Sequence, residues 1–236
     1  MPELIQPPPD LHERQDRYRL TARPKRTFQT FLSAEDIIDV QGTRAAVISS
    51  RRQGDEVTLG FEFPLARGRI DETLTLDLHE GRLRCRRLVR SVSNGTGERV
   101  RLEETLFRDR TFPLPESAYP EVALPFLLAW QPMDGRTRDL YAWINDRFVA
   151  RVEYQSQGEV DLALPSGTRK AIKKIMYPDF NDWIPLGKVL SRMARPFVPK
   201  YHMWFSLEAP HTVLRFEGPY GPPGAPEIVL EWLPPC

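Results

Sequence analysis

The chain has 236 residues, which is enough for one sizeable domain or two small ones. Apolar residues make up 41% of it, so a core can be buried and wholesale disorder is excluded. Charged residues are abundant at 28%, but they balance to a formal net charge of +1, whereas dedicated nucleic-acid-binding proteins usually carry a clear basic excess. We therefore expect a soluble globular protein with no nucleic-acid partner.

The cysteines and the apolar runs limit the cellular setting. Cys85 falls inside a predicted strand and Cys236 is the last residue, so neither a disulfide framework nor a cysteine-based metal site is expected. The first thirty residues contain no apolar core of the kind that a signal peptide needs. No stretch approaches the roughly 18 apolar residues of a transmembrane segment. As given, the sequence predicts a cytoplasmic protein, or a periplasmic one if an export signal has been removed.

The N-terminal residues differ in character from the rest. Residues 1–17 contain Pro7-Pro8-Pro9 and then a run of charges, which predicts a flexible, proline-rich arm. From Tyr18 onwards apolar side chains recur with a period of two, and no linker divides the chain. We expect the arm over residues 1–17 and a single β-rich half-barrel domain over residues 18–236.

Alternating apolar and polar residues predict antiparallel strands joined by short turns. Segments 57–63 and 74–78 show the pattern, and Glu80-Gly81 and Ser93–Gly97 supply turns after them. The Asn94-Gly95 pair within the second turn is expected to supply the positive φ of a tight hairpin. Further strands are expected to begin at Val100 and to cover residues 139–144, 148–154, 160–164, 203–207, 212–217 and 228–232.

Two segments favour helices. Residues 121–130 (EVALPFLLAW) are almost wholly apolar and suit a short buried helix that Pro125 limits or kinks. Residues 186–195 combine an apolar face with basic residues elsewhere, which predicts an amphipathic helix. The expected fold is mainly β: a single curved antiparallel sheet, or half-barrel, wrapped around one or two short helices.

The C-terminal half carries a family resemblance. Its motifs are Arg138-Asp139-Leu140-Tyr141-Ala142-Trp143, the strand and turn over residues 161–168, Met203-Trp204-Phe205-Ser206, Pro210, and the alternating residues 213–217. In this order and spacing, residues 129–233 resemble the DUF3108 family, a bacterial domain of unknown function. The resemblance implies a curved sheet similar to the LolA and LolB lipoprotein carriers and to the half-barrel of the violacein-pathway enzyme that uses no cofactor. It also implies export, because family members usually begin with a signal peptide.

A half-barrel with an incompletely filled concave face offers a natural apolar pocket. The leading hypothesis is therefore a binding module that holds an apolar or amphipathic small molecule or lipid between sheet and helix. The candidate ligand-binding residues are aromatic side chains and one arginine for a polar head group: Phe126, Trp130, Trp143, Tyr177, Trp183, Trp204 and Arg215.

A cofactor-independent enzyme acting on an aromatic or polyketide-like substrate is the alternative. Its candidate catalytic residues cluster around one predicted hairpin, where acid–base groups would lie close together: His202, Glu208, His211 and Arg215. The histidines show neither HxH nor HExxH spacing, so no metal site is predicted. No GxGxxG or Walker A run occurs, so no nucleotide cofactor is predicted.

A third hypothesis is a structural or partner-binding protein. Arg82, Arg84 and Arg86 predict a basic patch that an anionic ligand or partner would fit, although nearby glutamates favour cross-strand ion pairs. The helix at residues 186–195 would permit peripheral membrane contact. The sequence leaves the oligomeric state open.

Overall fold

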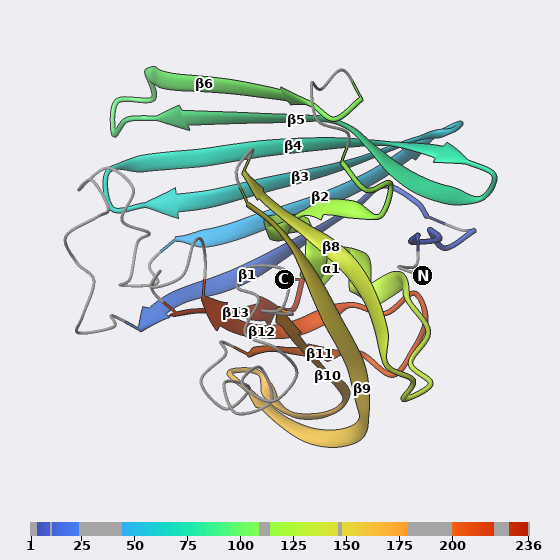
Figure 1. Ribbon diagram of the computed structural model, residues 1–236. Helices are drawn as coiled ribbons and strands as arrows, with labels where there is room; N and C mark the ends of the chain where they lie inside the picture. Colours follow the sequence, from blue (N-terminus) through green and yellow to red (C-terminus); the bar gives the residue numbers. More distant parts are fainter. Residues whose placement is uncertain are drawn as a thin grey trace, which may run out of the picture.

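The computed structural model describes residues 4–9, 11–23, 44–108, 114–145, 148–178, 200–219 and 227–235. They form one 13-stranded sheet, with the strands in the order β6-β5-β4-β3-β2-β1-β13-β12-β11-β10-β9-β8-β7 (Figure 1). The sheet curves without closing. We call the concave side, which carries the main core, the inner face, and the opposite side the outer face.

The elements fall into two runs along the chain. The first run is β1 (Arg14–Arg23), β2 (Ala45–Gln53), β3 (Glu56–Leu65), β4 (Gly68–His79), β5 (Arg82–Ser93) and β6 (Arg99–Leu106). The second begins with β7 (Ala118–Pro120), the 3-10 turn η1 (Glu121–Ala123), the helix α1 (Leu124–Leu127) and the 3-10 turn η2 (Leu128–Trp130). It continues with β8 (Arg138–Asn145), β9 (Phe148–Leu164), β10 (Gly167–Pro178), β11 (Tyr201–Phe205), β12 (Val213–Pro219) and β13 (Glu227–Leu233).

The pairing of the strands is simple. Every neighbouring pair is consecutive along the chain except β1 and β13, which pair antiparallel and join the two runs into one sheet. The pairing of β7 with β8 is parallel, and the other pairings are antiparallel. The predicted fold class, a mainly β protein with a curved antiparallel sheet around a short helix, is confirmed.

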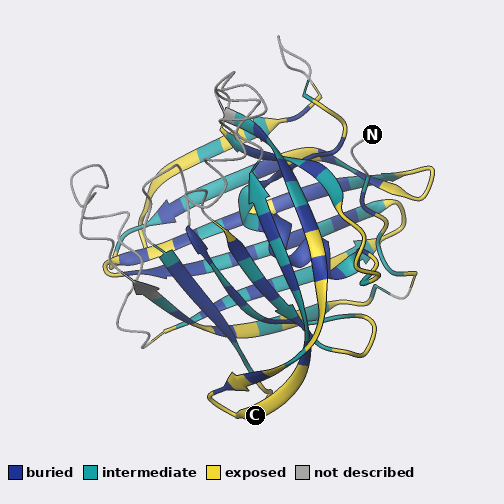
Figure 2. Cartoon of the chain, turned by 60° about the horizontal axis from the view of Figure 1, so that its bottom comes forward, coloured by how far each residue is buried: buried dark blue, intermediate teal, exposed yellow. Residues whose placement is uncertain are grey.

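Burial follows the predicted period of two. In β3, Val57, Leu59 and Phe61 are buried, while the residues between them are half-buried. The partner strand continues the pattern, because Leu74 of β4 lies opposite Leu59. Figure 2 shows the same alternation of buried and less buried residues across the sheet. Because side chains point alternately to the inner and outer faces along each strand, the alternation of apolar residues places the core on the inner face.

The predicted helix at residues 121–130 is present as three short pieces, η1, α1 and η2. Pro125 occupies the first turn of α1, where its missing N–H leaves no intrahelical hydrogen bond unmade. The helix lies within the curve of the sheet, between the first run and strands β8–β10 (Figure 1). Phe126 packs against Tyr18 and Phe61, with ring centroids 5.8 and 5.6 Å away. The helix therefore fills much of the concave side.

Residues 4–9, expected to belong to a flexible arm, pack against the sheet. Ile5 is fully buried, and β1 begins at Arg14, inside the predicted arm. The Leu83 N–H donates to the Ile5 carbonyl at 2.8 Å, so the segment has both an apolar partner and a backbone partner. The prolines concealed this role because they suggested a segment without fixed contacts.

Several predicted strands differ in detail. β9 runs unbroken through Phe148–Leu164 instead of forming two strands. β10 was not predicted, because five of its first eight residues are basic or threonine and break the apolar alternation. The hairpin Ser93–Gly97 is present, but its positive φ of 84° falls at Gly97 and not in the Asn94-Gly95 pair. The Asn94 Oδ1 instead accepts from the Thr96 and Glu98 backbone N–H groups.

Two expectations fall on residues outside the described ranges: the amphipathic helix at residues 186–195 and the candidate ligand-binding residue Trp183. Among the described residues, no helix is long and apolar enough to cross a membrane.

Candidate ligand-binding site

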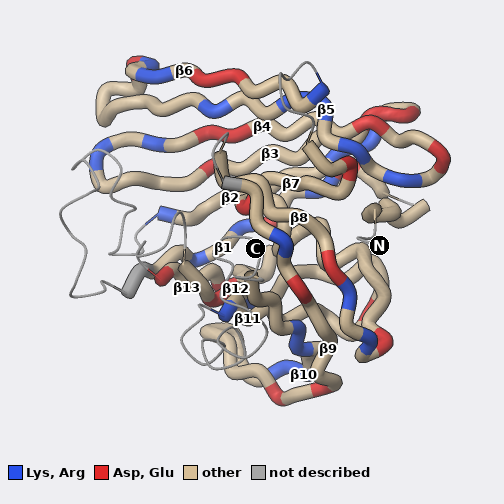
Figure 3. Tube along the Cα trace, viewed as in Figure 1, with Lys and Arg blue, Asp and Glu red and all other residues tan. Residues whose placement is uncertain are grey.

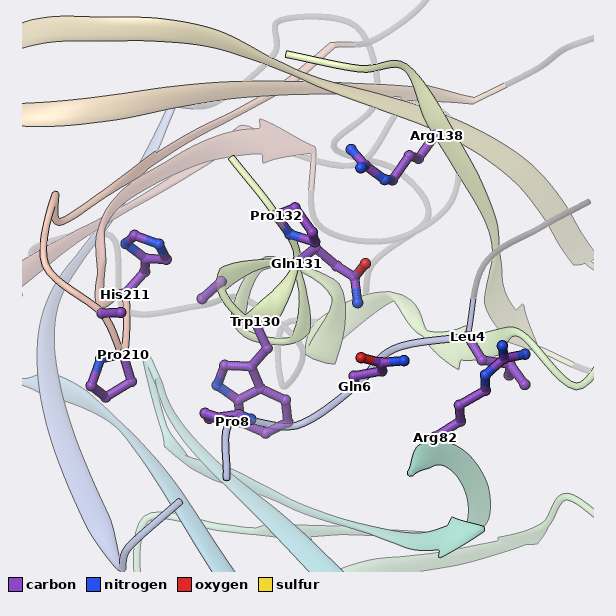
Figure 4. A pocket seen from close by; sticks show the side chains of 12 residues that line it. Leu4, Gln6, Pro8, Arg82, Trp130, Gln131, Pro132, Arg138, Pro210 and His211 are labelled. Carbon is purple, nitrogen blue, oxygen red and sulfur yellow. The ribbon is translucent and has the colours of Figure 1, made fainter. Parts of the chain in front are cut away.

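A cavity of about 750 Å³ opens at one end of the curved sheet, and we call it the mouth pocket. Its wall comes from the N-terminal segment, the β4–β5 turn, the end of the helix and the loop between β11 and β12. In Figure 4, Leu4 and Arg82 lie on one side, Pro210 and His211 on the other, and Trp130 between them. The remaining lining residues are Gln6, Pro8, Ala129, Gln131, Pro132, Arg138 and Ala209. The volume falls within the range of about 300–1,000 Å³ typical of small-molecule sites.

Tyr119 holds one wall of this pocket. Its hydroxyl accepts a hydrogen bond from the Ile5 N–H at 3.1 Å and donates one to the Leu83 carbonyl at 2.7 Å. Tyr119 is fully buried, and burial raises its pKa well above the ordinary value of 10, a direction that keeps the hydroxyl protonated. Since Tyr119 belongs to the edge strand β7 and Leu83 to β5, this side chain also links two distant strands of the sheet.

Lys174 supports the end of the helix that lines the mouth pocket. It is fully buried on β10, and its Nζ donates to the Leu128 carbonyl at 2.8 Å and the Gln131 carbonyl at 3.1 Å. The last carbonyls of a helix lack some intrahelical partners, and Lys174 supplies a donor here in addition to the Gln131 N–H, which bonds to the Leu128 carbonyl at 3.3 Å. The capped residues flank Trp130, which lines the pocket. Lys174 thus ties the pocket-lining end of the helix to the sheet.

The surroundings of Lys174 disfavour its charge. Burial, with a smaller contribution from Arg138, lowers the pKa of Lys174 from 10.5 to about 7, while Asp134 opposes the change. The Nζ lies 5.7 Å from the centroid of the Tyr154 ring and 5.5 Å from that of Phe205. Because its amine is fully buried and already bonded to two carbonyls, Lys174 acts on the pocket through the helix and not by direct contact with a ligand.

The two arginines of the mouth pocket have different surroundings. Arg138 donates to both carboxylate oxygens of Asp134, at 2.5 and 2.6 Å, which lowers the pKa of Asp134. Arg82 is exposed, and no hydrogen bond or ion pair joins its guanidinium to another residue in the described part of the chain. Arg82 is therefore the pocket cation that is available to an anionic group.

A smaller cavity of about 280 Å³, which we call the side pocket, adjoins the mouth pocket. The two share Ala129, Trp130, Pro210 and His211. The side pocket runs inward along β1 and β2 to residues of the core, including Tyr18, Ile48, Leu59, Phe126 and Val213. Trp130 thus stands between a polar-lined opening and a more apolar recess.

The structure separates the predicted ligand-binding residues. Trp130 lines both pockets and Phe126 lines the side pocket. Trp143 belongs to the main core, where it packs on Phe107 with ring centroids 5.2 Å apart. Tyr177, Trp204 and Arg215 are half-buried and alternate with inner-face residues of their strands, so they lie on the outer face.

The predicted catalytic residues are also divided. His202 and Arg215 lie on the outer face, where His202 is opposite Glu217 and Arg215 is opposite both Trp204 and Glu231. Glu208 is exposed in the β11–β12 loop. His211 lines the mouth pocket and its Nδ1 lies 2.8 Å from the Ser206 carbonyl oxygen.

The outer-face residues form a charge ladder across β10–β13 and β1. Arg215 pairs with Glu217 and lies 3.4 Å from Glu231, which also pairs with Arg19. Arg215 and Lys173 stack near the Trp204 ring, with centroid distances of 5.6 and 5.2 Å. Each of these arginines has a carboxylate or ring partner, as expected for a face held by cross-strand pairs.

His202 is held neutral within this ladder. Burial, with a contribution from Lys173, lowers its pKa below the ordinary value of 6.5, while Glu217 opposes the change.

Within the described residues, no three His, Cys, Asp or Glu side chains gather in a metal-binding arrangement.

Sequence reasoning missed two side chains that support the mouth pocket, Tyr119 and Lys174, and it considered Arg82 only as part of a basic patch with Arg84 and Arg86. A usable signal existed for Lys174, because it lies two residues before the buried Met176 and so shares the inner face of β10. Tyr119 had no such signal, since its hydrogen bond to the Leu83 carbonyl joins residues 36 positions apart in the chain.

No family model matches the chain, and no curated protein matches it. Among solved structures, it is similar to a β-barrel-like protein of the domain of unknown function DUF1849 from Brucella abortus. The TM-score is 0.46 and the sequence identity 11%, over 99% of this chain and 98% of that chain. The predicted resemblance to the DUF3108 family therefore remains a prediction.

Proposed function

We propose that the protein binds an amphipathic small molecule at the mouth of its curved sheet. The apolar part lies along Trp130 and enters the side pocket, and an anionic head group meets Arg82. The observation that carries this proposal is the 750 Å³ pocket, whose wall combines an aromatic platform, prolines and a cation without a partner among the described residues.

The division of the pocket supports an amphipathic ligand over a purely apolar one. The inner part of the side pocket reaches the core aromatics Tyr18 and Phe126, although Arg14 and Asp16 also line that pocket. The mouth pocket carries Arg82, Gln6 and Gln131. Burying apolar surface contributes about 25 cal/mol per Å² before the costs of association are subtracted. A charge-assisted hydrogen bond to an arginine then fixes the orientation of the head group.

The concave face as a whole gives less support to binding than the sequence implied. The main core and the helix occupy it, with Phe126 packed against both Tyr18 and Phe61. We therefore place the proposed site at the end of the sheet and not along its inner face. The enzyme alternative lacks support from its predicted residues, because the described part of the chain does not bring all four of them to one cavity.

Extraction and add-back test this proposal. The purified protein is examined by native mass spectrometry, extracted with organic solvent, and then titrated with dodecanoate and with its uncharged counterpart dodecanol. The proposal predicts saturable binding of dodecanoate that quenches or shifts tryptophan fluorescence, and weaker binding of dodecanol. If neither compound binds and nothing is recovered by extraction, the proposal is wrong.

A further inference from the structure

Strand β6 forms one edge of the sheet, and no described strand pairs with its far side (Figure 1). Half of the backbone N–H and C=O groups of an edge strand point away from its neighbour and are available to another strand. Three large apolar side chains on β6 are also exposed: Val100 at 55%, Leu102 at 56% and Leu106 at 45%. An edge of this kind fits a partner that adds a further strand.

The faces of β6 follow from its register with β5. Arg101 lies opposite the buried Val92, and Glu103 lies opposite Arg90, so Arg101 and Glu103 are on the inner face. Leu102 lies opposite Ser91 and is therefore on the outer face. Within one copy, the Arg101 Nε donates a hydrogen bond to the Glu103 Oε1 at 2.9 Å.

The charges of β6 are complementary to themselves when the strand is reversed. The strand begins with Arg99 and Arg101 and continues with Glu103 and Glu104 (Figure 3). A second copy that approaches antiparallel brings its acidic half to the basic half of the first. Opposite charges facing each other across two strands stabilise the pair, and like charges destabilise it.

We propose that two copies of the chain pair through β6, antiparallel, about a two-fold axis at Leu102. In this register Arg101 of each copy faces Glu103 of the other, and the two Leu102 side chains meet on the outer face. A two-fold axis keeps the inner face of one copy continuous with the inner face of the other. The pairing register between the two β6 strands can therefore change only in steps of two residues. A shift in one direction places Arg101 against Arg101, and a shift in the other removes the Arg101–Glu103 pairs.

The charge pattern distinguishes this pairing from simple protection of an edge. Charged residues on an edge strand, including those on the inner face, are a common means of preventing association. Protection requires only charge, whereas the order Arg, Arg, Glu, Glu adds an attraction to the reversed strand. The partner that fits the edge is therefore a second copy of this chain.

Charge exchange tests the pairing in the full chain. Arg101→Glu and Glu103→Arg each place like charges opposite each other, and each is expected to raise the dimer dissociation constant by about tenfold or more in sedimentation equilibrium. The double variant restores opposite charges and recovers the wild-type constant. A wild-type protein that stays monomeric at all concentrations overturns the proposal, and so does a folded double variant that does not recover.

A cysteine pair tests the register independently of the charges. Both variants are made with Cys236→Ser, since Cys85 is buried. Leu102→Cys places two thiols opposite each other at the axis, where oxidation is expected to give a covalent dimer. Val100→Cys is the control, because its two copies lie four residues apart along the strands, about 14 Å. Equal cross-linking of both variants, or none at Leu102→Cys, contradicts the register. Neither experiment uses the mouth pocket, so this proposal stands or fails separately from ligand binding.

Discussion

The mouth pocket and the outer-face ladder both combine a tryptophan with arginine side chains, but the two regions differ in how their charges are compensated. On the ladder, Arg215 has Glu217, Glu231 and the Trp204 ring as partners. At the mouth, Arg82 has no partner within the described residues, and Trp130 borders open volume instead of another side chain's charge. The same residue types therefore stabilise the sheet in one place and leave contacts open in the other.

This difference shows why residue type alone did not identify a site. The predicted candidates His202, Trp204 and Arg215 have the chemistry of a binding site, yet cross-strand pairing uses that chemistry within the sheet. What separates the two regions is the support behind each. The ladder rests on regular strand pairs, whereas the mouth depends on single side chains, Lys174 and Tyr119, that hold irregular segments in place.

The largest expected change in stability comes from removing the Lys174 side chain, which holds the end of the helix at the mouth pocket. Lys174→Ala removes the side-chain donor shared by the Leu128 and Gln131 carbonyls, of which the first keeps only the Gln131 N–H, and it opens a void. The free energy of unfolding is therefore expected to fall by about 3 kcal/mol. Chemical denaturation followed by circular dichroism measures this. A change of less than about 0.5 kcal/mol, the range of ordinary surface substitutions, would show that the helix end needs no cap.

The pH dependence of stability tests the same residue. Burial lowers the pKa of Lys174 from 10.5 to about 7, so between these values the unfolded chain binds a proton that the folded chain does not. The free energy of unfolding should therefore rise with pH above about 7, at up to about 1.4 kcal/mol per pH unit from this group. Lys174→Met removes that contribution, and the difference between the two proteins across pH 7 to 9 isolates it. Parallel pH profiles would contradict the lowered pKa.

Substituting one tryptophan in each region compares their contributions to ligand affinity. Trp130→Ala removes the aromatic wall shared by both pockets and is expected to weaken dodecanoate binding by roughly 30-fold, about 2 kcal/mol. Trp204→Ala on the outer-face ladder is the matched control and should bind as the wild type does. Fluorescence or calorimetric titration compares them; equal losses in both variants would remove the distinction between the two regions.

A smaller effect is expected from the pocket cation. Arg82→Gln should weaken dodecanoate binding by about tenfold while leaving dodecanol binding unchanged, because a single charge-assisted contact is lost. Arg67→Gln provides the control, since Arg67 is exposed in the β3–β4 turn, at the opposite end of the strands from the β4–β5 turn. If Arg67→Gln weakens dodecanoate as much as Arg82→Gln does, the attraction is general and not local.

The smallest effect is expected on the ladder itself. His202→Gln should change the free energy of unfolding by no more than about 0.5 kcal/mol and leave ligand affinity unchanged, because His202 is neutral and half-buried on the outer face. Thermal denaturation and titration measure the two quantities. A large loss of dodecanoate affinity would show that His202 contributes to ligand binding.

Local patterns predicted much of the fold. Strands were predicted from the alternation at residues 57–63 and 74–78, and a buried helix from the apolar run at 121–130. These predictions succeeded because the spacing of apolar residues within a segment reflects the periodicity of its own secondary structure. Strand β10 escaped prediction, since its inward Lys174 broke the apolar pattern for a structural reason. The pairing of β1 with β13, which unites the sheet, has no local signal at all.

The site was less predictable than the fold, and the reason is physical. The mouth pocket brings together residues from the two ends of the chain and the middle, among them Leu4, Trp130 and His211. Of the seven predicted ligand-binding residues, Trp130 and Phe126 line the pockets, and their role in binding remains a prediction. Which aromatic faces a cavity depends on long-range packing, and this cannot be read from the residues alone.

The most decisive test of a ligand site at the mouth is calorimetric titration of the wild-type protein with dodecanoate, below its critical micelle concentration and at several temperatures. We expect one saturable site with a negative heat-capacity change, because apolar surface is buried in the mouth and side pockets. We also expect Trp130→Ala to abolish most of that heat-capacity change. The absence of saturable binding, or the same thermodynamic signature in wild type and Trp130→Ala, would contradict a ligand site at the mouth of the sheet.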